Sequence, residues 1–327
     1  GLDPYYYVTR QTVFGGVAIG AMLVISMLSP EAVRRIGVIG FLCAFVALML
    51  LPFFGTDFGK GAVRWYSLGF GSFQPSEFLK PGFVIMAAWL MSAAMEINGP
   101  PGRLYSFVVA LIIVLLLAFQ PDFGQACLIL FAWGVMYFVA GAPIMLLSVV
   151  GGLVVAGGLL AYDASEHFAR RIDGFLAAEI DPRTQIGYAT NAIQQGGFFG
   201  VGVGEGTVKW SLPDAHTDFI FSVVGEEFGT LTCLVLAALF AFLVLRGLKR
   251  AMDMREGFPQ LAAAGLFVML GLQALINMAV NLNLMPAKGM TLPFVSYGGS
   301  SMLAVSLAMG LALALTRRRP QARGGQV

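Results

Sequence analysis

Residues 219–245 read FIFSVVGEEFGTLTCLVLAALFAFLVL, an apolar run with only two charged side chains. A helix needs about 20 such residues to cross the ~30 Å hydrocarbon core of a bilayer. Outward along the chain, eight further segments have this character, giving nine spanning candidates: 11–28, 36–54, 78–95, 104–119, 124–140, 142–162, 219–245, 260–282 and 299–316. The sequence therefore predicts an all-α, polytopic integral membrane helix bundle, with residues 1–327 forming one transmembrane domain.

The composition indicates the same class of protein. Hydrophobic residues make up 58% of the chain and charged residues only 12%, whereas soluble domains have about 45–50% and about 25%. A soluble enzyme, a disordered tail and a nucleic-acid-binding protein are therefore excluded. Cys43, Cys127 and Cys233 all lie inside apolar runs, which argues against a disulfide framework or a zinc site.

Lysine and arginine are unevenly distributed between the two sets of loops. One set carries Arg34, Arg35, Arg103, Arg246, Lys249, Arg250, Arg255, Arg317, Arg318, Arg319 and Arg323, and the other carries Arg10, Lys60, Arg64, Lys80 and Lys288. Because cytoplasmic loops are enriched in positive charge, the richer set is expected inside. The C-terminus is then cytoplasmic and the start of this sequence is outside.

This orientation places segments 55–80, 163–218 and 285–300 on the outer face. The long connection 163–218 is rich in aromatic residues, including Phe198 and Trp210, and poor in residues typical of disorder. Long structureless loops are uncommon unless they are functional or disordered. We therefore expect a partly ordered extracytoplasmic loop that leads into the helix after Asp218.

The first polar group lies before the third span. Ser76 is a candidate N-cap, and Glu77 and Lys80, three residues apart, share one helix face. Lys80 is either a snorkelling lysine paired with Glu77, with Arg64 as a headgroup anchor, or part of an anion site in which Arg64 and Lys80 bind phosphate. The residues alone leave both interpretations open.

The second group surrounds Asp218. Thr217 is expected to cap a helix whose first turn holds Asp218. An acidic side chain in the first turn interacts favourably with the helix dipole. The sequence alone favours this capping role over a catalytic one. His216 is either an acid or base or a solvated interfacial residue. Glu226 and Glu227 lie inside a spanning segment, where carboxylates are costly, so we expect them to form structural ion pairs.

The third group, residues 288–301, is a turn-rich connector into the last span, with Ser300 as a cap candidate. Helices that begin near Ser76, Thr217 and Gly299 would all run from outside to inside. Their partly positive N-termini then lie at the outer leaflet. Together with Arg64, Lys80 and Lys288, they would suit an anionic headgroup such as a lipid pyrophosphate.

Two other patterns have simpler explanations. The glycine-rich residues 200–206 lack the Gly-Lys-Ser/Thr of a nucleotide loop and predict a tight outer loop. Gln273, Asn277 and Asn281 form an i, i+4, i+8 stripe that predicts interhelical hydrogen bonds.

Three motifs together carry a family resemblance. They are Arg64-Trp65 with QPSE at 74–77, LPDAHTDFIF at 212–221, and PFVSYGGS at 293–300. In this order the chain resembles the SEDS proteins (shape, elongation, division and sporulation) over essentially its whole length. Residues 288–293, KGMTLP, look more like the division member than the elongation member. The family has ten spanning helices with both ends cytoplasmic, so the resemblance implies that its first helix is absent from this sequence.

The resemblance implies an inverting peptidoglycan glycosyltransferase that polymerises lipid II into glycan strands for the division septum. The family's essential aspartate corresponds to Asp218, which reverses the capping assignment and makes it the general base. Its important basic positions correspond to Arg64 and Lys80, on the pyrophosphate. Further substrate-binding positions are assigned to Gln74, Ser76, Glu77, His216, Thr217, Lys288, Ser296, Gly298, Gly299 and Ser300.

The resemblance also implies a bacterial inner membrane, an active site facing the periplasm, and membrane lipids around the bundle. The expected partners are a class B penicillin-binding protein, FtsI-like, and the division proteins FtsQ, FtsL and FtsB. No cofactor is assigned; a divalent cation on the pyrophosphate is compatible with the chain, which offers no clear metal-ligand set. The alternatives are a lipid II flippase, an elongation-type polymerase and a scaffold that recruits division proteins.

Overall fold

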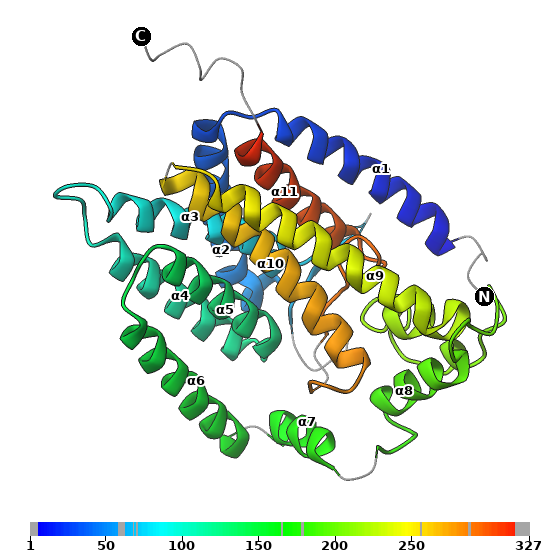
Figure 1. Cartoon of the computed structure of the whole chain (residues 1–327). Helices are drawn as coiled ribbons and strands as arrows, with labels where there is room; N and C mark the ends of the chain where they lie inside the picture. The colour runs from blue at the N-terminus through cyan, green and yellow to red at the C-terminus, as the bar shows by residue number, and fades with distance from the viewer. Residues whose placement is uncertain are drawn as a thin grey trace. The chain divides into compact units, whose positions relative to one another are not determined.

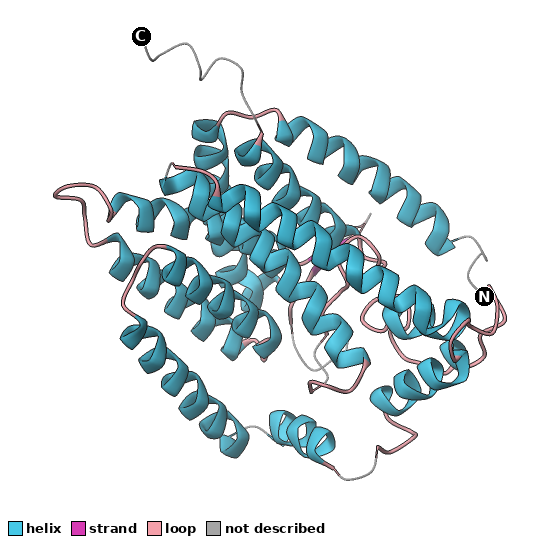
Figure 2. Ribbon diagram, in the orientation of Figure 1, coloured by secondary structure: helices cyan, strands magenta, loops and turns pink. Residues whose placement is uncertain are grey.

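The computed structural model describes residues 6–57, 63–67, 69, 71–164, 166–177, 180–255, 257–286 and 289–317 (Figures 1 and 2). The helices are α1 Tyr6–Ser26, α2 Pro30–Phe54, α3 Pro75–Ala93, α4 Gly102–Phe119, α5 Phe123–Val139, α6 Ile144–Ala164, α7 Glu166–Leu176, α8 Gln185–Gly196, the 3₁₀ turn η1 Val208–Trp210, α9 Ile220–Met252, α10 Gly257–Asn281 and α11 Gly299–Thr316. Two short strands, β1 Tyr66–Ser67 and β2 Ser72–Phe73, pair in antiparallel register.

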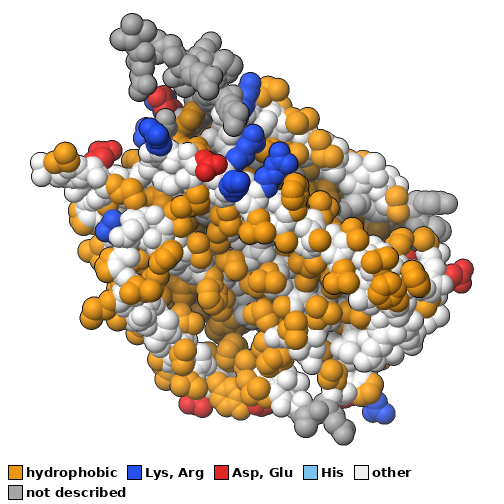
Figure 3. All heavy atoms as spheres, viewed as in Figure 1, with side chains coloured by type: hydrophobic (Ala, Val, Ile, Leu, Met, Phe, Trp, Pro, Cys, Tyr) orange, Lys and Arg blue, Asp and Glu red, His pale blue; other side chains and the backbone are white. Residues whose placement is uncertain are grey.

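Each of the nine predicted spans coincides with a helix, and the predicted all-α membrane class is confirmed. Within the described ranges, seven helices are long and apolar enough to cross a bilayer: α1, α2, α4, α6, α9, α10 and α11. Helix α5 has only 17 residues, and the first two turns of α3 contain Glu77 and Lys80. Hydrophobic side chains cover most of the face seen in Figure 3, as lipid-facing helices require.

The chain divides into two compact units. The first comprises residues 1–116, 244–268 and 299–327. In it, α2 packs against α3 and α1 packs against α11. A Cβ on Gly82 of α3 would lie 2.8 Å from the Phe41 backbone of α2, so this contact needs a glycine.

The second unit comprises residues 117–243 and 269–298. Its apolar core joins Phe221, Cys233 and Phe240 of α9 to Ala274 and Met278 of α10. Leu292, from the connection between α10 and α11, completes this cluster. Side chains from three segments that are distant in sequence therefore hold the start of α9 against α10.

Helix α9 is broken at Gly229, whose φ is +80°. A neighbouring segment bonds the backbone groups that the break exposes: Val201 N–H donates to the Glu226 carbonyl at 2.9 Å, and Thr230 N–H donates to the Gly197 carbonyl at 2.9 Å. Irregular backbone at membrane depth is tolerated where protein satisfies it in this way. The loop after α8 has positive φ at Gly200, Gly202 and Gly204, so the predicted tight loop is confirmed.

Candidate active site

Asp218 lies in a tight turn just before α9, not in the first helical turn. The Asp214 carbonyl accepts from the N–H groups of Thr217, Asp218 and Phe219 at 3.1, 3.1 and 3.3 Å. Asp214 has φ +54°, a conformation that Asp tolerates better than most residues. The Thr217 hydroxyl donates to the same carbonyl at 3.1 Å. The predicted capping of α9 by Thr217 is therefore wrong, because its hydroxyl closes the preceding turn.

The polar stripe of α10 holds this turn by the backbone carbonyl of Asp218. Asn277 Nδ2 donates to that carbonyl at 2.8 Å and to the Met290 carbonyl at 2.6 Å. Asn281 Nδ2 donates to the Asp218 carbonyl at 3.0 Å, and Gln273 Nε2 donates to the Thr291 carbonyl at 3.1 Å. The bonds described so far go to connecting segments, and two further bonds join Asn281 to Ser222 of α9.

The connection 289–297 lies against the Asp218 turn. Ser296 Oγ donates to the Thr217 carbonyl at 2.6 Å and accepts from Leu292 N–H at 2.7 Å. Tyr297 N–H donates to the His216 carbonyl at 2.8 Å, and the two rings lie 5.6 Å apart. The structure therefore brings together His216, Thr217, Asp218 and Ser296, with Gly298 two residues beyond Ser296.

Gly289 borders the carboxylate of Asp218. A Cβ at Gly289 would lie 3.1 Å from Asp218 Oδ2, closer than most real Cβ contacts. The side chain of Asp218 is itself only partly buried. The carboxylate therefore combines a backbone fixed by α10 with a glycine at its side.

The first unit holds the polar group around Lys80. Lys80 Nζ donates to Glu77 Oε2 at 2.9 Å, and the two side chains are 3% and 4% exposed. The pairing expected from their spacing is confirmed, but Lys80 is buried rather than snorkelling to water. Removing one partner of a buried pair of this kind is strongly destabilising.

Ser76 does not cap α3, contrary to the prediction. The cap position belongs to Gln74, whose side chain makes no capping hydrogen bond, and the helix begins at Pro75. Proline is favoured at the first helical position because it lacks the N–H that would remain unbonded there. Gln74 and Ser76 are both buried, whereas Arg64 is partly buried in the segment that precedes β1.

Helix α11 begins at Gly299, with Ser300 in its first turn rather than at its cap. A Cβ at Gly299 would lie 2.8 Å from the Phe14 ring of α1, so this glycine permits α11 to pack closely against α1. Helix α11 also packs against α3 and β2 within the first unit. Lys288 lies outside the described residues.

Glu226 and Glu227 anchor the connection between α8 and α9. Glu226 is fully buried and accepts from the backbone N–H groups of Thr207, Val208 and Lys209 at 2.6, 2.7 and 3.1 Å. The Lys209 ammonium pairs with Glu227. The structural role is confirmed, although Glu226 binds backbone rather than a cation.

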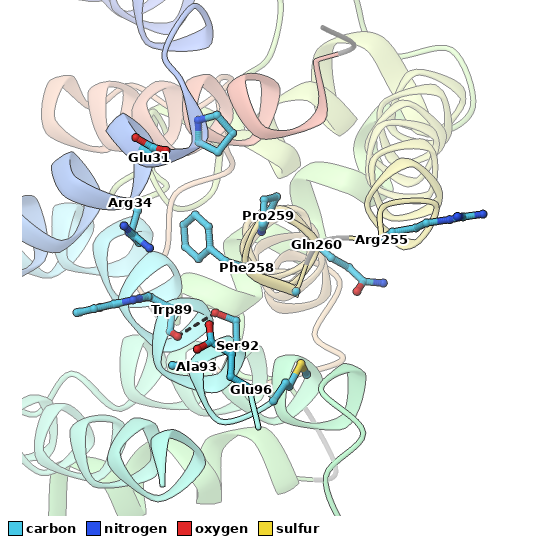
Figure 4. Close-up of a pocket in the computed structure, with 13 residues that line it drawn as sticks. Glu31, Arg34, Trp89, Ser92, Ala93, Glu96, Arg255, Phe258, Pro259 and Gln260 are labelled. Carbon is cyan, nitrogen blue, oxygen red and sulfur yellow. Dashed lines mark hydrogen bonds between the residues drawn. The ribbon is translucent and has the colours of Figure 1, made fainter. Parts of the chain in front are cut away.

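A cavity of about 600 Å³ lies at the other end of α3 (Figure 4). The Arg34 guanidinium lies 5.9 Å from the Trp89 ring centre, whereas Arg255 points away from the other labelled residues. Lys80 and Ser92 of α3 are twelve positions apart, which is about 18 Å along a helix. The cavity is therefore not part of the group around Lys80.

In the described ranges, no three His, Cys, Asp or Glu side chains gather where they could hold a metal ion. The chemical groups that the structure offers are the Asp218 carboxylate in one unit and the buried cation of Lys80 in the other. These are a proton acceptor and a charge that can stabilise an anion.

Comparison with known proteins assigns the class. A family model described as "Cell cycle protein", covering FtsW, RodA and SpoVE, matches residues 2–321. The chain belongs to this family, the SEDS family of multi-pass membrane proteins.

Individual relatives are more specific. The probable peptidoglycan glycosyltransferase FtsW of Caulobacter vibrioides is 45% identical over 98% of this chain and 82% of the relative. The corresponding FtsW of Trichlorobacter lovleyi is 37% identical over 95% of this chain and 84% of its own length.

Solved structures of similar fold include members of the same family. A chain of a peptidoglycan synthase complex that coordinates polymerization and crosslinking aligns with TM-score 0.79 at 29% identity, covering 98% of this chain and 91% of that one. RodA of Thermus thermophilus aligns with TM-score 0.69 at 28% identity, covering 96% and 88%.

Proposed function

We propose that this chain is a peptidoglycan glycosyltransferase of the FtsW type, which polymerises lipid II into glycan strands during cell division. The observation that carries the proposal is the Asp218 carboxylate, fixed through its backbone by α10 and bordered by Gly289. The names of the FtsW relatives support the reaction class.

The mechanism follows from the two chemical groups. Asp218 takes the proton from the 4-hydroxyl of the acceptor N-acetylglucosamine, and that oxygen attacks the anomeric carbon of the donor sugar. The bond from this carbon to the pyrophosphate breaks, and undecaprenyl pyrophosphate leaves with its charge. One displacement inverts the anomeric centre. Positioned proton transfer of this kind typically contributes ~10²–10⁴-fold to the rate.

Arg64 and Lys80 stabilise the pyrophosphate leaving group. Glu77 holds Lys80 in place at 2.9 Å, which preorganises the cation before substrate arrives. Gln74 and Ser76 in the buried start of α3, Gly299 and Ser300 at the start of α11, and His216, Thr217, Ser296, Gly298 and Lys288 bind the rest of the substrate.

The connection 163–218 is assigned to the periplasmic side, where α7, α8 and η1 form a folded cap. Residues 1–327 then form one catalytic domain in the bacterial inner membrane, with the C-terminus in the cytoplasm and enrichment at the division septum. An FtsI-like class B penicillin-binding protein cross-links the strands, and FtsQ, FtsL and FtsB regulate the pair. A divalent cation would bind through the substrate's pyrophosphate.

Purified protein in liposomes with fluorescent lipid II tests the reaction class. The proposal predicts glycan polymer when the FtsI-like partner is supplied. Lipid II translocation without polymer would indicate a flippase instead. Absence of both activities would indicate a scaffold. Rescue of septation, but not of elongation, in a depleted bacterium would separate the division role from that of a RodA-type polymerase.

A further inference from the structure

At the start of α9, one backbone hydrogen bond is absent that would form if the helix extended back through Asp218. In a continuous α-helix the Ser222 N–H would donate to the carbonyl four residues earlier, which is that of Asp218. Here Ser222 N–H donates to Asn281 Oδ1 at 3.0 Å, while Asn281 Nδ2 donates to the Asp218 carbonyl at 3.0 Å. The side-chain amide of Asn281 therefore occupies both ends of the missing bond.

Chemistry fixes the orientation of this amide. A backbone N–H can only donate and a carbonyl can only accept, so Oδ1 faces Ser222 and Nδ2 faces Asp218. The Ser222 hydroxyl also donates to Oδ1 at 2.7 Å, and the second Nδ2 hydrogen reaches the Asn277 carbonyl at 2.9 Å. Ser222 and Asn281 are fully buried. Every group of the amide is satisfied, which makes the arrangement stiff.

We propose that Asn281 is a positioning residue that acts as a wedge, keeping α9 from extending backward through Asp218. This inference rests on the proposed function, in which the Asp218 carboxylate is the general base. With the wedge in place, Ser222 N–H donates to Asn281 and, within its own segment, makes the tighter three-residue bond to the Phe219 carbonyl at 3.0 Å. Helical geometry accordingly begins at Ile220.

The consequence is control over the direction of the Asp218 side chain. Without the Asn281 amide, the Asp218 carbonyl keeps its bond from Asn277 at 2.8 Å, but its second lone pair can accept from Ser222 N–H, and Asp218 then enters the helix. Each residue added to a helix turns the next side chain by about 100°. The carboxylate then leaves its place beside Gly289, and a displacement of ~1 Å can already cost 10²-fold in rate.

The test uses Asn281→Leu, which has a similar size but no amide. Polymerisation by the purified protein with its FtsI-like partner is measured over a range of lipid II concentrations, together with the melting temperature. We expect kcat to fall about 10- to 100-fold, with KM within about threefold. The melting temperature should fall only modestly, because Ser222 N–H can pair with the Asp218 carbonyl while the Ser222 hydroxyl loses its bond to Oδ1. This split marks the loss of an interaction that matters only in the transition state.

Gln273→Leu is the matched control, since it removes from the same stripe an amide that donates to the Thr291 carbonyl. It should keep kcat within about threefold of the wild type. Asn281→Asp is the second variant: it can still accept from Ser222 but, when ionised, cannot donate to the Asp218 carbonyl, so it should also lose kcat.

Several results would overturn the wedge. They are a wild-type kcat in folded Asn281→Leu, equal losses in Asn281→Leu and Gln273→Leu, or a rise in KM alone. Loss of folding in both Asn281 variants would likewise reduce the residue to a structural role. Failure of the proposed function looks different, because Asp218→Asn would then polymerise normally. An inactive Asp218→Asn with a fully active Asn281→Leu refutes the wedge alone.

Discussion

The anchoring of the cap by Glu226 gives a prediction whose size can be worked out from the contacts. One carboxylate oxygen accepts from Thr207 and Val208 N–H at 2.6 and 2.7 Å, and the other accepts from Lys209 N–H at 3.1 Å. In Glu226→Gln the remaining oxygen keeps the first two bonds in weaker, uncharged form. The new NH₂ group faces Lys209 N–H, so two donors oppose each other.

The lost charge-assisted bond is worth about 1.5–3 kcal/mol, and weakening the other two adds to this. We therefore expect the segment around Thr207 to open more easily by about 2–4 kcal/mol. Since 1.4 kcal/mol is a factor of ten, amide exchange at residues 207–209 should rise roughly 30- to 700-fold.

Hydrogen–deuterium exchange with mass spectrometry on the protein in nanodiscs measures this change. Glu205→Gln is the control, because Glu205 lies in the same loop but is exposed. The control should exchange like the wild type. If Glu226→Gln also exchanges like the wild type, then the buried carboxylate does not hold the cap, and the role assigned to it is wrong.

Two further substitutions separate folding from catalysis. Lys80→Met leaves Glu77 buried without the Lys80 ammonium and should destabilise the protein by about 3–5 kcal/mol. The double variant with Glu77→Leu should recover the melting temperature but not polymerisation. If the double variant polymerises lipid II, Lys80 has no part in the mechanism. Gly289→Ala places a Cβ 3.1 Å from the Asp218 carboxylate and should lower kcat about tenfold with a normal melting temperature. The control Gly16→Ala adds a Cβ with nothing within 4 Å and should have no effect. A wild-type kcat in Gly289→Ala would show that the carboxylate can move without loss of activity.

The spanning helices could be predicted because length and apolar character alone decide them. The helix starts could not, since each depends on which partner satisfies a particular backbone group. Ser76 has the side chain of a cap, but Pro75 starts α3 one position earlier. Thr217 also has the side chain of a cap, but its hydroxyl bonds to Asp214. The sequence alone does not show which of several competing groups bonds to a given backbone N–H or carbonyl.

The polar stripe of α10 shows what a pattern does and does not contain. Its spacing predicted interhelical hydrogen bonds, which Asn281 makes with Ser222 of α9, whereas Asn277 bonds to the connecting segments that hold Asp218 and Met290. Their shared target, the Asp218 carbonyl, lies 59 and 63 residues away in the chain, and only folding brings the two segments together. An intramembrane stripe of amides is nevertheless a usable signal for residues that position an active site.

Asp218→Asn tests the central claim most directly. The change keeps the side-chain size and leaves the Asp218 carbonyl bonded to Asn277 and Asn281, so melting and lipid II binding should stay close to the wild type. Asparagine cannot take a proton from the acceptor hydroxyl, and polymerisation with the FtsI-like partner should fall ~10²-fold or more. Glycan polymer at near the wild-type rate from folded Asp218→Asn would contradict the account.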